Sequence, residues 1–137
     1  MHLQEVPLPY GFFNIFPKGM DVSVGHCSFS PSFCNSENRT LIATERKPHA
    51  SLASIEVDIG WAIMKSYRRK GFATEAAQGV IKYGFETLKL PRIVAGTDRD
   101  NIAFQKVMEK LGLRLFNQPD GVGIIGVIAN PCRAIAF

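Results

Sequence analysis

The sequence predicts a single mixed α/β domain, spanning residues 1–137, whose central and largely antiparallel sheet is flanked by helices. Three observations support this fold class: a first half of short alternating or aromatic segments, one long stretch with helical periodicity, and a β-branched segment followed by a shorter helix. The expected order is β-β-β-α-β-α-β-β. A chain of 137 residues is long enough for one continuous core.

The first two strands are predicted to form a hairpin. Residues 10–16 are strongly aromatic, and residues 22–29 alternate around Gly25. Between them, residues 17–21 have the composition of a turn. Residues 30–54 contain Pro, Ser, Asn, Thr and charged residues without sustained periodicity, so they are predicted to be a long loop.

The third strand and the first helix follow each other directly. Residues 55–63 carry apolar side chains at the odd positions, which places Glu56, Asp58 and Gly60 on the opposite face. Thr74 or a neighbour is expected to cap the helix, and Pro91 ends any continuation. The helical stripe consists of apolar or small residues at 73, 76, 77, 80, 81, 84, 85 and 88.

The remaining elements alternate strand and helix before a final pair of strands. Residues 92–97 form a short β-branched segment, and residues 98–101 offer turn and N-cap chemistry. The second helix is predicted to run to about Leu111, because Gly112 suits the position after a helix end. Strand-like pieces follow at 113–116 and 122–129.

The turn between the third strand and the first helix predicts an anion site. Gly71 lets the backbone approach a ligand closely, and the free N–H groups of the helix start point at it. Arg68, Arg69 and Lys70 add positive charge, although basic residues at a helix start oppose its dipole by about 0.3–1 kcal/mol each. The alternative is a set of solvated charges. Neither GxGxxG nor GxxxxGK[ST] is present, so dinucleotide and P-loop sites are not predicted.

The overall composition is typical of a soluble globular protein, with 46% hydrophobic and 20% charged residues. No apolar run reaches the length of a membrane span, and the N-terminus lacks the order of a signal peptide. Cys27, Cys34 and Cys132 show no CxxC spacing, so a reducing, cytoplasmic location without disulfides or a metal is expected. The net charge of +4 has no long basic stripe, so nucleic-acid binding is not expected.

Residues 56–116 resemble the GNAT superfamily of acyl-CoA-dependent N-acetyltransferases, within it the ribosomal-protein-alanine acetyltransferase branch. The family's motif of Arg or Gln, two residues, Gly, one residue, and Gly or Ala appears here at residues 68–73. Residues 58–61 resemble its acidic-Ile-Gly-aromatic strand. Residues 98–101 and 107–113 resemble its second cofactor-contacting segment, and weaker similarity reaches back to the hairpin at 10–29.

The resemblance implies a GNAT-like fold and transfer of an acetyl group from the cosubstrate acetyl-CoA, without a metal, to a primary amine. The acceptor would be a protein N-terminus or a small-molecule amine. The edge of the strand at Ala62, Ile63 and Met64 would pair with the pantetheine arm. Asn101 would hydrogen-bond the arm, act as an ordinary helix cap, or do both. Backbone groups around the CoA pyrophosphate would come from Arg68, Arg69, Lys70, Gly71, Phe72, Ala73 and Thr74.

The sequence departs from the family pattern in two ways. The family usually has a strand and two helices before the hairpin, where this chain has nine residues. The branch's frequent Asn-x-x-Ser ends here in Phe104, and a tyrosine found in many relatives is replaced by Met108, so neither usual proton donor is present. The alternative function is therefore an acyl-CoA-binding module or a degenerate, catalytically weak GNAT protein. A third alternative is an interaction protein that keeps only the fold.

Three residues are candidates for the general base. Asp58 and Glu56 lie about 7 Å apart on one strand face, and each has the alternative of a solvated or ion-paired carboxylate. His26 is the third candidate, with a satisfied structural histidine as its alternative. A backbone N–H near Ile63 or Met64 is the candidate oxyanion donor. An α-amine loses its proton more easily than lysine by about 3 kcal/mol, which favours a low-pKa acceptor.

The aromatic residues of the first strand have no evident partner within the chain. Tyr10, Phe12, Phe13 and Phe16 would form an exposed patch, which predicts a homodimer through the hairpin. The alternative is that the loop at 30–54 folds back over the same surface.

Overall fold

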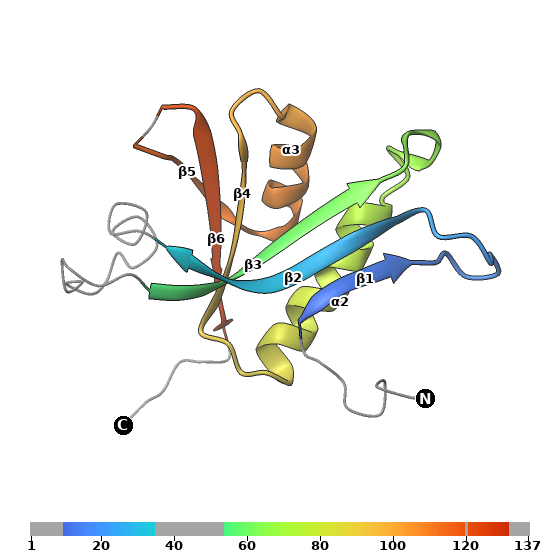
Figure 1. Ribbon diagram of the computed structural model, residues 1–137, viewed down its shortest axis with the longest axis horizontal. Helices are drawn as coiled ribbons and strands as arrows, with labels where there is room; N and C mark the ends of the chain where they lie inside the picture. Colours follow the sequence, from blue (N-terminus) through green and yellow to red (C-terminus); the bar gives the residue numbers. More distant parts are fainter. Residues whose placement is uncertain (1–9, 35–53, 120, 132–137) are drawn as a thin grey trace.

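The computed structural model describes residues 10–34, 54–119 and 121–131. Two helices, α2 (Phe72–Glu86) and α3 (Ile102–Leu111), and the short 3-10 turn η2 (Lys65–Tyr67) accompany one six-stranded sheet, as shown in Figure 1. The strands are β1 (Gly11–Ile15), β2 (Gly25–Cys34), β3 (Ser54–Ile63), β4 (Arg92–Asp98), β5 (Arg114–Asn117) and β6 (Gly123–Ala129). The predicted fold class and element order are confirmed.

The sheet has the strand order β1-β2-β3-β4-β6-β5 and is antiparallel except between β3 and β4. Those two strands run parallel because α2 forms the crossover that connects them. The parallel pair therefore lies in the middle of the sheet, with a three-stranded antiparallel portion on each side.

Strand β2 extends further than the sequence analysis predicted. It continues through residues 30–34, which were assigned to the long loop, because the first half of β3 pairs with it from Ser30 opposite Asp58 to Cys34 opposite Ser54. Pro31 fits this strand because β1 stops pairing at Phe29, and the ring nitrogen points away from β3. The rest of the predicted loop, residues 35–53, lies outside the described residues.

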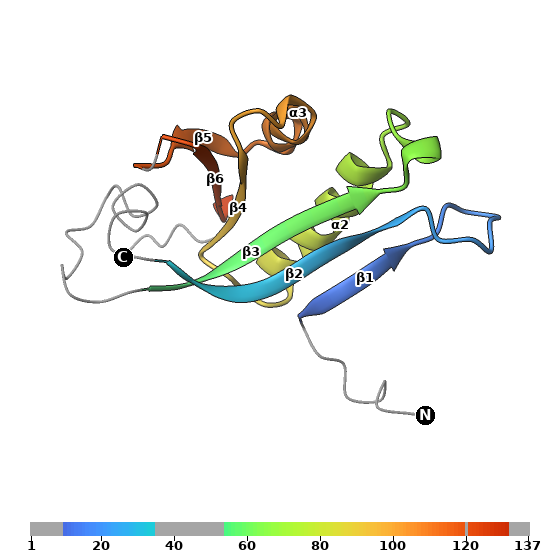
Figure 2. The same ribbon diagram turned by 45° about the horizontal axis from the view of Figure 1, so that its top comes forward.

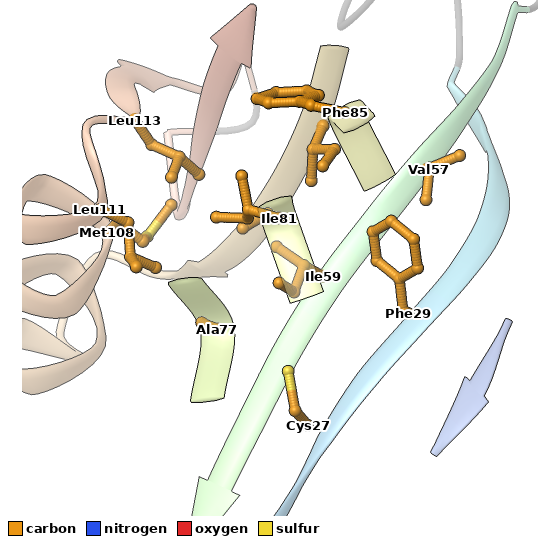
Figure 3. Close-up of a cluster of buried hydrophobic side chains, with 12 residues drawn as sticks. Cys27, Phe29, Val57, Ile59, Ala77, Ile81, Phe85, Met108, Leu111 and Leu113 are labelled. Carbon is orange, nitrogen blue, oxygen red and sulfur yellow. The ribbon is translucent and has the colours of Figure 1, made fainter. Parts of the chain in front are cut away.

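Both helices pack on the same face of the sheet. Figure 3 shows α2 and α3 contributing side chains to one cluster with strands β2, β3 and β4. Burial of each large apolar side chain contributes about 1.5–3 kcal/mol, so this cluster provides much of the stability that holds the helices in place. Its members are Cys27, Phe29, Val57, Ile59, Ala77, Ile81, Phe85, Ile93, Ala95, Met108, Leu111 and Leu113.

A second, smaller cluster lies on the opposite face of the sheet. Successive side chains of a strand alternate between faces, so Val94 points away from its neighbours Ile93 and Ala95. It packs with Ile125 and with the half-buried Phe116 and Val127. The even-numbered residues of β3, including the two candidate carboxylates, share this second face.

The helix ends follow local chemistry only in part. Asn101 caps α3, its Oδ1 accepting a hydrogen bond from the Phe104 N–H at 3.1 Å, and Gly112 closes that helix in the left-handed conformation, as predicted. Helix α2 begins after Gly71 without a side-chain cap, so the expectation that Thr74 or a neighbour caps it is wrong. Neither described helix combines the length and apolar character needed to cross a membrane.

Candidate active site

The site is built where β3 and β4 separate. Asp58 lies opposite Val94, the one register pair recorded between these strands in the described ranges. Beyond this pair the two strands diverge toward their C-terminal ends, as Figures 1 and 2 show. A parallel pair that splays in this way leaves backbone groups of both strands without the neighbour that a continuous sheet would supply.

Successive residues of β3 direct their backbone N–H and C=O groups alternately toward β2 and toward β4. The Met64 N–H donates to the Val24 carbonyl at 2.8 Å, and the Ala62 carbonyl also faces β2, where it would collide with any side chain on Gly25. The alternation directs the backbone of Ile63 toward the open side. Of the two amides named as alternative oxyanion donors, that of Met64 is therefore already paired with Val24, whereas that of Ile63 faces the open side. Of the three residues expected to meet the pantetheine arm, only Ile63 presents its backbone there.

The basic turn has an unusual backbone. Arg69 and Gly71 both have positive φ angles, 65° and 82°, and α2 begins at Phe72. The first hydrogen bond of the helix is from the Glu75 N–H to the Gly71 carbonyl at 3.0 Å. Among described groups, no acceptor is recorded for the N–H groups of residues 69–74, and left-handed residues in such a turn make N–H groups converge into an anion-binding concavity.

Two further observations show that the space beside Gly71 is open and that the turn is positively charged. A Cβ added to Gly71 would meet no described atom within 4 Å, so the space in front of the turn is open. The Arg68 Nε donates to the Ile63 carbonyl at 3.0 Å, which ties the guanidinium to the end of β3. Arg69 and Lys70 are exposed beside it, with the Lys70 Nζ 5.8 Å from the ring centre of Tyr67.

The two candidate carboxylates have different surroundings. Glu56 is 4% exposed and forms a bidentate pair with Arg92, in which Nε and Nη2 each donate to one carboxylate oxygen at 2.7 Å. The Asp58 carboxylate has no recorded hydrogen bond or ion pair with a described residue, and burial raises its pKa to about 6. A desolvated carboxylate with that pKa has the properties of a general base near neutral pH, whereas Glu56 is held by its cation.

The structure does not bring His26 to Asp58. His26 lies opposite Ala62, four residues along β2 from Ser30, which faces Asp58. Four residues of strand correspond to about 13 Å. The His26 ring instead meets Phe12 edge to face, with ring centres 5.2 Å apart.

Asn101 lies at the end of β4, on the other arm of the splayed pair. It is exposed and lines an open pocket of about 660 Å³ formed by residues 98–101 together with Gly121 and Val122. Gln105 steadies this corner, its Nε2 donating to the carbonyls of Asp98 and Arg99 at 3.3 and 2.7 Å. The Asn101 side chain caps α3 through its Oδ1, and its Nδ2 takes no part in the cap. Asn101 can therefore cap the helix and donate to a ligand at the same time.

The sequence analysis missed an aromatic pair between strand β3 and helix α3. Trp61 of β3 and Phe104 of α3 stack with ring centres 4.1 Å apart and an interplanar angle of 9°. Phe104 occupies the position at which the branch frequently has serine, and Met108 is fully buried in the core. The residues that replace the usual proton donors therefore serve packing. A helical wheel would have placed Phe104 on the inner face, but its partner on β3 is fixed only by tertiary structure.

Comparison with known proteins identifies the family and the fold. The family profile described as an acetyltransferase (GNAT) domain matches residues 2–114. The uncharacterized N-acetyltransferase YnaD of Bacillus subtilis is 44% identical over 57 residues, which are 42% of this chain and 34% of YnaD. The matched stretch thus spans about a third of that relative's length.

Solved structures share the fold. A GNAT-family acetyltransferase from Bacillus anthracis superposes with a TM-score of 0.65 at 27% identity, covering 92% of this chain and 70% of that one. RimL, a ribosomal L7/L12 α-N-protein acetyltransferase in complex with coenzyme A, gives a TM-score of 0.60 at 15% identity over 86% of this chain and 60% of its own. The family match covers most of the sequence, and the chain therefore belongs to the GNAT acetyltransferase domain family.

Proposed function

We propose that this protein is an acetyl-CoA-dependent N-acetyltransferase that moves an acetyl group to a primary amine by direct attack. The observation that carries the proposal is the turn at residues 69–74. There, N–H groups for which no described residue is a recorded acceptor, two left-handed residues and three cations precede or begin α2. This is the chemistry that recognises a pyrophosphate.

The described residues fit CoA. The backbone of Arg69 through Thr74 would hold the pyrophosphate, and the open space at Gly71 leaves room for its oxygens. The backbone of Ile63 would pair with the pantetheine arm between the splayed strands, and Asn101 would contact the arm from β4. When bound, acetyl-CoA supplies an acetyl group activated as a thioester.

Asp58 is proposed as the general base. Its carboxylate is half-buried at the point where β3 and β4 part, and a pKa of about 6 leaves it largely ionised at pH 7. It would accept a proton from the acceptor amine, directly or through a water molecule. Glu56 is the weaker candidate because its two oxygens are occupied by Arg92. The Ile63 N–H lies five residues along β3 from Asp58, about 17 Å away, so it would pair with the pantetheine arm and not with the acetyl carbonyl beside Asp58.

The acceptor is proposed to be an amine of low pKa, such as a protein N-terminus. An α-amine has a pKa of about 7.7–8.0, roughly 2 units above Asp58, whereas lysine at about 10.4 lies more than 4 units above it. At 1.36 kcal/mol per unit, proton transfer from lysine is less favourable by about 3 kcal/mol. RimL, whose name describes an α-N-protein acetyltransferase, provides a precedent in the same fold. Small-molecule amines of similar pKa satisfy the same argument.

A second function is favoured by the aromatic pair. Phe104 and Met108 supply no hydroxyl to protonate the leaving thiolate, which fits an acyl-CoA-binding module or a catalytically weak enzyme. Isothermal titration with CoA, followed by thiol release from acetyl-CoA with a panel of amines, separates the alternatives. Binding with amine-dependent release supports the enzyme, binding alone supports the module, and no binding supports an interaction protein. We place the reaction in the cytoplasm, in keeping with the free thiol of Cys27, and expect no membrane or nucleic-acid partner.

A further inference from the structure

Exposed apolar side chains are concentrated on the β1–β2 hairpin. Phe12 is 77% exposed and Phe16 55% exposed. The other large hydrophobic residues exposed in the described part of the chain are Met64, Ile102 and Val122. Such a concentration normally marks an interface. The exposed hairpin set is Phe12, Phe13, Phe16, Met20 and Val22. Phe12 packs beside His26 on the face of β1 opposite Phe13, so Phe13 and Phe16 are the aromatic residues on the side of α2.

Tyr10 does not belong to this patch. It is half-buried, and its ring lies 5.7 Å from the ring of Phe29. The expectation that Tyr10 lacks a partner within the chain is therefore wrong, and the exposed surface begins at Phe12.

A groove of about 740 Å³ runs beside the patch. Residues 13–18 form one wall, and the outer side of α2 forms the other. The residues that α2 contributes to the lining include the small Ala76 and Gly79. The lining also carries one charge of each sign, Lys18 on the hairpin and Glu75 on α2.

No contact with a described residue requires glycine at position 79. A Cβ added at Gly84, in the same helix, would lie 2.9 Å from Phe29 and 3.0 Å from Ile93, so that glycine is required by internal packing. A Cβ added at Gly79 would meet no described atom within 4 Å. Glycine in a helix interior lowers helix stability without such a reason. A close approach by another chain within the groove would supply the reason.

We propose that a second copy of this chain docks here, each hairpin packing into the groove of the other around a twofold axis. An isologous contact requires that one surface carry both the protruding and the receiving element, which the hairpin and the adjoining groove provide. The same symmetry pairs Lys18 of one copy with Glu75 of the other, twice. Aromatic side chains of the hairpin fill the space above Gly79. This inference is independent of the proposed acetyltransferase activity.

Light scattering coupled to gel filtration, from low to high micromolar concentration, tests the proposal. The wild type is expected to shift from monomer to dimer. Gly79→Gln is expected to raise the dissociation constant at least about tenfold while the monomer melts at the same or a higher temperature, because glutamine favours the helix. Gln78→Ala, at the neighbouring exposed position that does not line the groove, is the matched control and should leave the dissociation constant unchanged.

A charge reversal distinguishes docking from general destabilisation. Glu75→Lys alone should weaken the dimer by about tenfold, because it faces Lys18 of the other copy. Combining it with Lys18→Glu should restore dimerisation. A strictly monomeric wild type at high micromolar concentration would overturn the proposal. A dimer that is indifferent to Gly79→Gln and to both charge variants would overturn it as well.

Discussion

Replacing Gly71 by alanine is the most direct way to perturb the proposed phosphate site. At φ 82° a side chain is strained, at a cost of about 1–2 kcal/mol, and its Cβ would project into the open space before the free N–H groups. Each N–H contact to a charged oxygen contributes about 1.5–3 kcal/mol. Loss of one or two such contacts should raise the dissociation constant for CoA by about ten- to a thousandfold or more.

The strain must be separated from the loss of binding. Gly19 in the hairpin turn has nearly the same φ angle, 80°, and a Cβ there would also meet no described atom within 4 Å. Gly19→Ala should therefore lower the melting temperature as much as Gly71→Ala, by about 4–8 °C, but leave CoA affinity intact. Titration calorimetry measures both affinities. Wild-type affinity in Gly71→Ala, or an equal loss in Gly19→Ala, would refute the assignment of the turn.

Four other outcomes follow from the same structure. Asp58→Asn should lower kcat/KM by about 10²–10⁴ without changing CoA affinity, and the wild-type kcat/KM should rise with pH around an apparent pKa of about 6; a flat profile would exclude Asp58 as the base. Burial raises the pKa of Asp58 from 3.8 to about 6, so between these pH values the folded state keeps a proton that the unfolded state has released. The free energy of unfolding should therefore decrease as the pH rises from about 4 to 6, and Asp58→Asn should remove this decrease in denaturant titrations. Glu56→Gln should destabilise by about 2–4 kcal/mol, measured by urea unfolding, because it removes the buried carboxylate from its bidentate pair with Arg92; a change within 0.5 kcal/mol would mean that the pair is not structural. Asn101→Ser keeps a capping oxygen, so stability should hold while calorimetry reports any weaker binding of CoA, and unaltered affinity would leave Asn101 as a cap only.

The parts of the fold that were predictable are those with local signals. Asn101 and Gly112 bound α3 because capping and left-handed closure depend on residues within one turn. Val57 and Ile59 of β3 are core residues, as their odd positions predicted, because alternation is a property of the strand itself. The end of β2 was missed because its extension depends on pairing with β3, which lies far away in sequence.

The site was predictable to a similar degree. Gly71 and its cations mark the turn in the sequence, but nothing local indicates that Arg69, a non-glycine residue, also adopts a positive φ. The distinction between Asp58 and Glu56 required tertiary structure, since the cation that holds Glu56 is 36 residues away. The register between β2 and β3 determines whether the Ile63 or the Met64 amide faces the open side. The sequence alone therefore could not show which of the two amides is available.

Thiol release from acetyl-CoA in the presence of peptides with a free α-amine tests the central claim most directly, if the wild type and Asp58→Asn are compared at equal occupancy by CoA. The proposed function predicts release that depends on the amine, that is greater for the α-amine than for a lysine side chain, and that is lost in Asp58→Asn although CoA still binds. Binding of CoA without release to any amine would contradict the enzyme and leave the binding module.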